Sequence, residues 1–174
     1  MALARMRISG ESAGPTPSDV AVALVAFGLT LLLLGLDHGA DRGLDALGVV
    51  LAAVASLPLL VRRRSPLAVF AVTALASAAL NGLDYALGPP FGATIALFYV
   101  AADERSRANI RLTAAVVLGI FAVHVASTAG AHGGFPTSAI LFGIVVWGGA
   151  WMIGDQVRQR RARAAALAER LRRA

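Results

Sequence analysis

The feature of this sequence that most constrains its fold is a series of apolar runs separated by short polar or Gly/Pro-rich segments. A helix that crosses the apolar core of a bilayer, about 30 Å thick, needs roughly 20 mostly apolar residues. Six runs approach or partly reach this length, at 20–36, about 44–61, 67 to about 80 or 83, 91–102, 112 to about 129 and 138–153. We therefore predict an all-α integral membrane protein, a bundle of about six transmembrane helices followed by a cytoplasmic connector helix.

Composition supports this class and excludes others. The chain is 57% hydrophobic and only 15% charged, whereas a soluble domain has about 25% charged residues. A soluble enzyme and a disordered regulator are both excluded, since disorder needs low hydrophobicity. The chain has no Cys, and it contains no P-loop, Gly-rich nucleotide motif or H-E-x-x-H sequence. We expect no catalytic, cofactor or metal site in these 174 residues.

The basic residues predict the orientation. All 16 are Arg, and short loops rich in Arg or Lys remain on the cytoplasmic side. The division above places 15 of them on the side of the N-terminus, and only Arg42 opposite. We predict a multi-pass protein of the cytoplasmic membrane with both termini in the cytoplasm. The basic charge then belongs to that face of the lipid bilayer and not to nucleic acid. The topology anchors would be Arg62, Arg63, Arg64, Arg105, Arg107 and Arg111.

Residues 67–102 allow two alternatives. The twelve apolar residues at 91–102 are short for a span, so this region is either two short spans or a re-entrant hairpin, which would leave four full spans. Two spans are favoured because irregular backbone exposed to lipid is not tolerated at membrane depth. In either case residues 1–18 are a flexible cytoplasmic tail, 19–154 the bundle and 155–174 the connector helix.

His124 is the candidate sensing residue. It lies inside an apolar run, and ionisable residues in membrane spans are candidates for functional sites. The simpler interpretation, which we favour, is a neutral His that hydrogen-bonds to a neighbouring helix. Asp37, His38, Asp41 and His132 lie in the opposite loops, but their spacing matches no defined metal motif, and solvated loops are the favoured interpretation.

Small and aromatic residues suggest helix contacts. Ala115 and Gly119, like Ala150 and Gly154, are four residues apart and therefore share a helical face that permits close packing. The contact would be either within the bundle or between two copies of the chain. Trp147 and Trp151 are expected to anchor one helical face near the membrane interface.

The segment after the last apolar run has the sequence of a basic helix without a breaker. Its expected connector residues are Gly154, Asp155, Val157, Leu167 and Leu171. Its heptads are weak, and the alternative is a basic helix lying on anionic lipid. A connector projecting into the cytoplasm is favoured because the apolar stripe is narrow and Arg occurs all around it. Leu167 and Leu171 are the candidates for homodimer contact.

Three segments resemble a known family. L-P-L-L-V-R-R-R-S-P-L (57–67), A-L-F-Y-V-A-A-D-E-R-S-R (96–107) and G-D-Q-V-R-Q-R-R (154–161) are similar to the N-terminal membrane region of actinobacterial nitrate-sensor-type sensor histidine kinases. The resemblance implies an exit helix that leads to a phosphoacceptor-His dimerisation helix and an ATP-binding domain. These 174 residues contain neither, so ATP, Mg²⁺ and a cognate response regulator would bind only to that kinase core. These residues would form its non-enzymatic, homodimeric input module.

The alternative is a small independent membrane protein, such as a transporter subunit or a partner-binding protein. A transporter is expected to show an internal repeat with broken helices at matching positions. Only one region, at 88–90, is interrupted by Gly and Pro. The sequence therefore favours a signalling module, in which a stimulus shifts a two-state helix bundle.

Overall fold

A computed structural model describes residues 14–36, 45–85, 89–103, 106, 108–132 and 137–173. Within these ranges the chain is helical and contains no strand, which confirms the all-α prediction. The elements are α1 (Pro17–Leu36), α2 (Ala46–Ser56), the 3₁₀ helix η1 (Leu57–Val61), α3 (Pro66–Gly82), α4 (Phe91–Ala102), α6 (Ile110–His132) and α7 (Thr137–Arg173).

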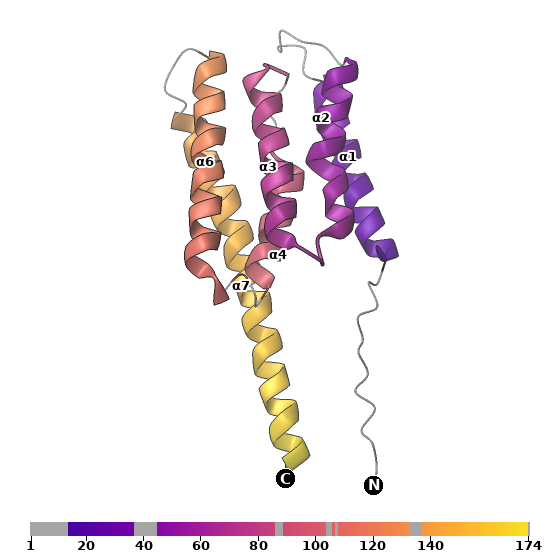
Figure 1. Ribbon diagram of the computed structural model, residues 1–174, viewed down its shortest axis with the longest axis vertical. Helices are drawn as coiled ribbons and strands as arrows, with labels where there is room; N and C mark the ends of the chain where they lie inside the picture. The colour runs from indigo at the N-terminus through magenta and orange to yellow at the C-terminus, as the bar shows by residue number, and fades with distance from the viewer. Residues whose placement is uncertain are drawn as a thin grey trace.

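The helices lie side by side and run alternately in opposite directions (Figure 1). Among the described helices, three are long and apolar enough to cross a membrane, namely α1, α6 and α7. The stretch formed by α2 and η1, together with α3 and α4, consists of shorter apolar helices. We call the end where α1 begins and η1 ends the basic end, because Arg62, Arg63 and Arg64 lie there. The other end is the distal end.

Polar side chains and prolines define where the helices begin. The backbone N–H of Thr16 donates to the carboxylate of Asp19 at 3.0 Å, at the start of α1. Asp45 caps α2 by accepting from the N–H of Gly48 at 2.7 Å. Pro66 is the first residue of α3, a position where its missing N–H costs nothing. Pro58 lies in η1, where the backbone changes from α to 3₁₀ geometry after Ser56.

The interior is built from small residues with a few large ones between them. The aromatic residues Phe70 and Trp147 pack edge to face, with ring centroids 5.4 Å apart. The fully buried alanines are Ala23, Ala26, Ala52, Ala74, Ala93 and Ala96. Small side chains permit close approach of helix backbones, which is how helices associate where lipid replaces water. Helix α4 packs chiefly against α7 and α3, whereas α6 packs chiefly against α3.

Two glycines mark the closest approaches between helices. A methyl group added to Gly92 would overlap the backbone carbonyl of Ala55 on α2. One added to Gly154 would overlap the carbonyl of Phe98 and lie 2.8 Å from Cβ of Ala101, both on α4. By contrast, a methyl group on Gly119 would meet no other described residue within 4 Å. The two small-residue pairs therefore differ: Gly154 packs inside the bundle, and Gly119 lies on an outer face.

Helix α7 continues beyond the other helices. It is a single 37-residue helix, about 55 Å long at 1.5 Å per residue. Its first half packs in the bundle, and residues 159–173 are all exposed. Figure 1 shows this second half projecting from the basic end. The predicted last span and connector are thus one uninterrupted helix.

Candidate functional site

A polar pair joins α3 and α6 in the distal half of the bundle. Nδ2 of Asn81, near the end of α3, lies 3.1 Å from Nε2 of His124 on α6. This contact is the helix-to-helix hydrogen bond that the sequence favoured. With the Asn81 amide donating, Nε2 accepts and the neutral ring carries its proton on Nδ1. That Nδ1 is buried and has no hydrogen-bond partner within the described part of the chain. The ring therefore offers one unused donor.

A cavity of about 300 Å³ adjoins this pair. His124, Asn81 and Thr128 contribute polar groups, and Phe121 and Trp147 contribute aromatic walls. A cavity of this size, with apolar walls and a few converging polar groups, is typical of small-molecule sites. Because none of the described residues that line it is charged, the cavity is suited to a neutral molecule with a hydrogen-bond acceptor.

Trp147 corrects a prediction. The sequence placed it near the membrane interface beside Trp151, but Trp147 is buried in the bundle. Its ring packs edge to face on Phe121, with centroids 5.5 Å apart, and lies 5.9 Å from the His124 ring. The four-residue spacing indicated a shared face correctly, but it carried no information on whether that face turns inward. Trp147 is therefore a wall of the cavity.

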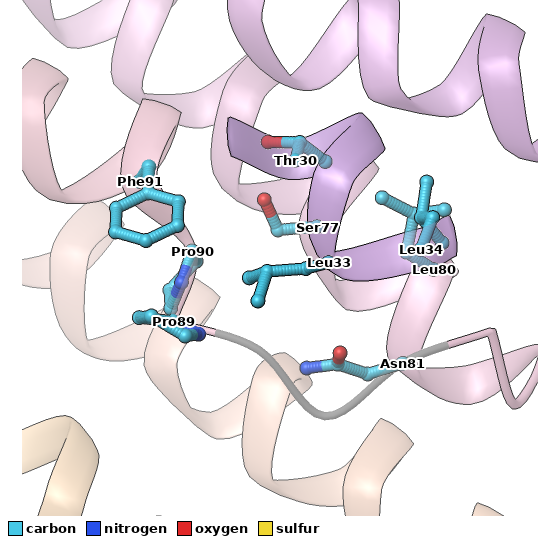
Figure 2. Close-up of a pocket in the computed structure, with 9 residues that line it drawn as sticks. All are labelled: Thr30, Leu33, Leu34, Ser77, Leu80, Asn81, Pro89, Pro90 and Phe91. Atoms are coloured by element: carbon cyan, nitrogen blue, oxygen red, sulfur yellow. The ribbon is translucent and has the colours of Figure 1, made fainter. Parts of the chain in front are cut away.

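A second, smaller cavity of about 40 Å³ lies on the other side of Asn81. Figure 2 shows Pro89, Pro90 and Phe91 across from Leu34 and Leu80, with Asn81 at the edge. This volume has room for water but not for an organic ligand. Asn81, Pro89 and Pro90 line both cavities, so the two prolines before α4 and Asn81 form a shared wall.

A buried ion pair lies at the basic end. Nη2 of Arg62 lies 2.8 Å from Oδ1 of Asp19, and both side chains are 2% exposed. Nε of Arg63 lies 3.1 Å from Oδ2 of the same carboxylate, although the Arg63 side chain is 61% exposed. The guanidinium of Arg62 also stacks over the ring of Tyr99, with Cζ 4.2 Å from the centroid. The cluster ties α1, the end of η1 and α4 together.

The three consecutive arginines therefore have different environments. Sequence reasoning grouped them as topology anchors, yet Arg62 is buried whereas Arg64 and Arg111 are exposed. Arg105 and Arg107 lie outside the described residues. Sequence reasoning missed the pairing of Asp19 with Arg62. The available signal was a carboxylate at the start of an apolar run, because charges in spans usually pair with one another.

The predicted connector residues divide into two groups. Gly154 is buried against α4, and the carboxylate of Asp155 accepts from Arg158 and, at 2.6 Å, from Nε2 of Gln159. Val157 is partly buried. Leu167 and Leu171 are 59% and 79% exposed on the projecting half of α7. These two apolar side chains lie one helical turn apart and therefore on the same face of the helix.

Among the described residues, no group of three or more His, Asp or Glu side chains is placed to hold a metal ion. Asp37, His38 and Asp41 lie outside the described residues, as does the side chain of His132.

Comparison with known proteins finds one family. The model of a family described as Domain of unknown function (DUF7134) matches residues 11–161. The match includes the ion pair, the His124 cavity and the Gly154 junction. No curated protein and no solved structure matches the chain. The match spans most of the 174 residues, and the chain belongs to the DUF7134 family.

Proposed function

We propose that this chain is the membrane-embedded input and signal-transmission module of a two-component sensor histidine kinase. It acts as a homodimer in the cytoplasmic membrane, with both termini in the cytoplasm. The resemblance of residues 57–67, 96–107 and 154–161 to that family supports this proposal. These residues perform no phosphotransfer themselves. Their role is to control a kinase core, which binds ATP and acts on the cognate response regulator.

The observation that carries the proposal is the continuity of α7. One helix runs from the wall of the His124 cavity at Trp147, past the packed Gly154, to the exposed Leu167 and Leu171. An unbroken helix transmits rotation or tilt as a rigid body, whereas a loop would absorb it. A change inside the bundle therefore reaches the apolar pair where a dimer partner would bind.

The input side of this mechanism is the cavity beside His124. Its walls come from α3, α6 and α7, through Asn81, His124 and Trp147. A molecule that bound there in only one arrangement of these helices would shift the two-state equilibrium by its difference in affinity. The unused Nδ1–H of His124 supplies a polar contact that selects such a molecule.

The orientation rests on the arginines. Arg63, Arg64 and Arg111 are exposed at the basic end, where they contact anionic headgroups on the cytoplasmic side. Because the chain has no Cys, the orientation can be measured by labelling single introduced cysteines. In intact cells an impermeant thiol reagent should label Gly39→Cys and leave Ser65→Cys unlabelled, and the reverse pattern would refute the orientation.

The connector role is tested by insertions after Gln159, in the chain fused to a histidine-kinase core. This point lies beyond the bundle and leaves the Asp155 hydrogen bonds intact. One inserted residue rotates the rest of the helix by about 100°, and seven residues, close to two turns, restore the phase. We expect the single insertion to lock autophosphorylation high or low and the seven-residue insertion to retain control. Equal behaviour of both would show a flexible tether and refute the proposal.

A further inference from the structure

A third hollow lies at the basic end, between α4 and α7. This groove has a volume of about 500 Å³. Its apolar walls include Ile95 and Phe98 on α4 and Val146 and Ile153 on α7. Its polar lining comes from Arg62, Thr94 and Tyr99. Val146 also lines the His124 cavity, so the two hollows lie on either side of one α7 residue.

Two of the lining residues have polar atoms that are buried without a partner. Arg62 uses Nε and Nη2 on Asp19 and stacks on Tyr99, but its Nη1 makes no hydrogen bond to any described residue. Oγ1 of Thr94 is likewise without a partner in the same part of the chain. A buried donor without an acceptor costs stability, more so when it is charged. Both residues line the groove, so an occupant that displaces the atoms covering Nη1 and Oγ1 would supply the missing acceptors.

The net charge of the Asp19, Arg62 and Arg63 cluster indicates the charge of that molecule. Arg62 and Arg63 carry two positive charges against the single negative charge of Asp19, which leaves a net +1 beside the groove. An anionic group opposite Arg62 balances this charge. Because the remaining walls are apolar, the molecule also needs a hydrophobic part.

The depth of the groove matches one class of amphipathic molecule. Ile153 directly precedes the junction where α7 becomes charged, and Val146 lies seven residues, about 10 Å, further into the bundle. The headgroup layer of a bilayer is about 5–7 Å thick on each side, above the acyl chains. A phosphate near Arg62, an ester carbonyl near Thr94, deeper in the groove than Phe98, and an acyl chain that continues past Val146 follow this order.

We infer that the groove between α4 and α7 binds an anionic glycerophospholipid of the leaflet at the basic end. A second copy of the chain is the other possible occupant, since Gly149 and Ala150 also line the groove. An apolar helix face from that copy would leave Arg62 Nη1 and Thr94 Oγ1 unpaired, whereas a phospholipid supplies oxygen acceptors for both. The inference does not depend on the proposed signalling role.

The site has a consequence for α7. Its walls are the two helices that meet at Gly154, so a bound lipid acts as a spacer just on the bundle side of that contact. The arrangement in which α4 and α7 leave the groove open is stabilised by the lipid.

The experiment uses the purified full chain in a neutral detergent, with lipid binding followed by native mass spectrometry and by thermal unfolding. The probes are phosphatidylglycerol, phosphatidylcholine with the same acyl chains, and inorganic phosphate. We expect one phosphatidylglycerol per chain to bind and raise the melting temperature, with no comparable effect of the other two. Equal effects of the two lipids would overturn the proposal, as would full stabilisation by inorganic phosphate, which would indicate an anion site without lipid.

Matched variants locate the binding. Thr94→Val removes one hydroxyl at similar size, and Thr30→Val is its control, because Oγ1 of Thr30 bonds to the Ala26 carbonyl on α1, away from the groove. We expect Thr94→Val to weaken phosphatidylglycerol binding about tenfold, the value of one hydrogen bond to a charged or strongly polar ligand, and Thr30→Val to leave it unchanged. Equal affinities of the two variants would overturn the site.

Arg62 is tested together with Asp19 because Arg62→Gln alone removes the buried charge partner of that carboxylate and leaves it only the exposed Arg63. In the double variant Asp19→Asn/Arg62→Gln the net charge of the cluster stays at +1 because Arg63 remains, but the groove loses the guanidinium that lines it. The preference for phosphatidylglycerol over phosphatidylcholine should therefore disappear. If this variant does not fold, the pair of threonine variants decides the question. A disulfide between two copies of Gly149→Cys that forms equally with and without phosphatidylglycerol would show that a second chain fills the groove, and would refute the lipid.

Discussion

Helices α4 and α6 are both mainly apolar, yet they occupy the bundle in opposite ways. Helix α4 has 12 residues, about 18 Å at 1.5 Å per residue, and packs against α3 and α7 with further contacts to α1 and α2. Helix α6 has 23 residues and packs chiefly against α3. Only α6 is long enough to cross a bilayer. A helix enclosed by others can be short, because its neighbours and not lipid surround its ends.

The residue types follow this difference. The buried positions of α4 are mostly small, including Gly92, Ala93 and Ala96, and permit approach from several sides. The outer face of α6 carries Leu112 and Leu118, which are 59% and 67% exposed, as expected for side chains in contact with lipid. Substitutions should therefore be costly on α4 and its contacts and mild on α6. A graded set of variants tests this expectation.

The largest effect is expected for Gly92→Ala. The added methyl group overlaps the backbone carbonyl of Ala55, and a backbone atom cannot rotate away as a side chain can. Relief requires α2 and α4 to separate. Overpacking in a close-packed core costs about 1–3 kcal/mol, and this variant should lie at or above the upper limit. Thermal unfolding in detergent measures the loss, and a melting temperature equal to that of the native chain would contradict the packing.

A smaller effect is expected for Gly154→Ala. Here the methyl group overlaps the Phe98 carbonyl and approaches Cβ of Ala101, so α7 should move away from α4 at a cost of about 1–3 kcal/mol. The movement is measurable by electron paramagnetic resonance between spin labels on Leu112→Cys and Arg163→Cys, two exposed positions in a chain without native Cys. The distance distribution should shift. An unchanged distribution together with unchanged stability would show that this contact does not fix α7.

The hydrogen bond between α6 and α3 should contribute less to stability than the two glycine contacts do. Replacing His124 by Phe removes the hydrogen bond to Asn81, and interhelical hydrogen bonds in membranes contribute about 0.6 kcal/mol on average and rarely more than 1.7. In a double-mutant cycle with Asn81→Leu we expect a coupling energy of about 0.5–1 kcal/mol from unfolding measurements. A coupling near zero would mean that the pair does not hold the two helices together.

The smallest effect is expected for Gly119→Ala, which is also the control for the two other glycine variants. The added methyl group meets open space, and Ala is favoured over Gly in a helix by about 1 kcal/mol. The melting temperature should stay the same or rise slightly. A clear decrease would show that this face of α6 is covered, as the sequence-based alternative of a dimer contact at Ala115 and Gly119 requires.

The sequence predicted where the helices lie better than which helices pack against one another. The observed bounds of α4 are those predicted for the fourth apolar run, because Pro90 before it and the charged residues from Asp103 after it limit the helix. The contacts of Asp19 with Arg62 and of Asn81 with His124 each join residues 43 positions apart. Neither could be predicted, because apolar runs show where a helix lies but not which side of it faces which neighbour.

The same limit explains the errors at single residues. The spacing of Trp147 and Trp151 was read as an interface anchor, and Trp147 lies in the interior. The sequence does not single out Gly92, since one glycine in an apolar run has no spacing that indicates close helix packing. Its role depends on the carbonyl of Ala55 on another helix. Packing of this kind depends on which helices are neighbours in space, and the spacing of apolar residues along the sequence does not predict it.

The length of α7 beyond Gly154 turns the contact at that residue into a fulcrum. The 19 residues that follow Gly154, up to Arg173, form an arm of about 28 Å. A tilt of about 10° at the fulcrum would displace the far end by about 5 Å, close to the rise of one helical turn. Shifts of 1–2 Å within a helix bundle are common in switching proteins, and this arm magnifies them. The position of the projecting half of the helix thus depends on how tightly a single glycine is held against α4.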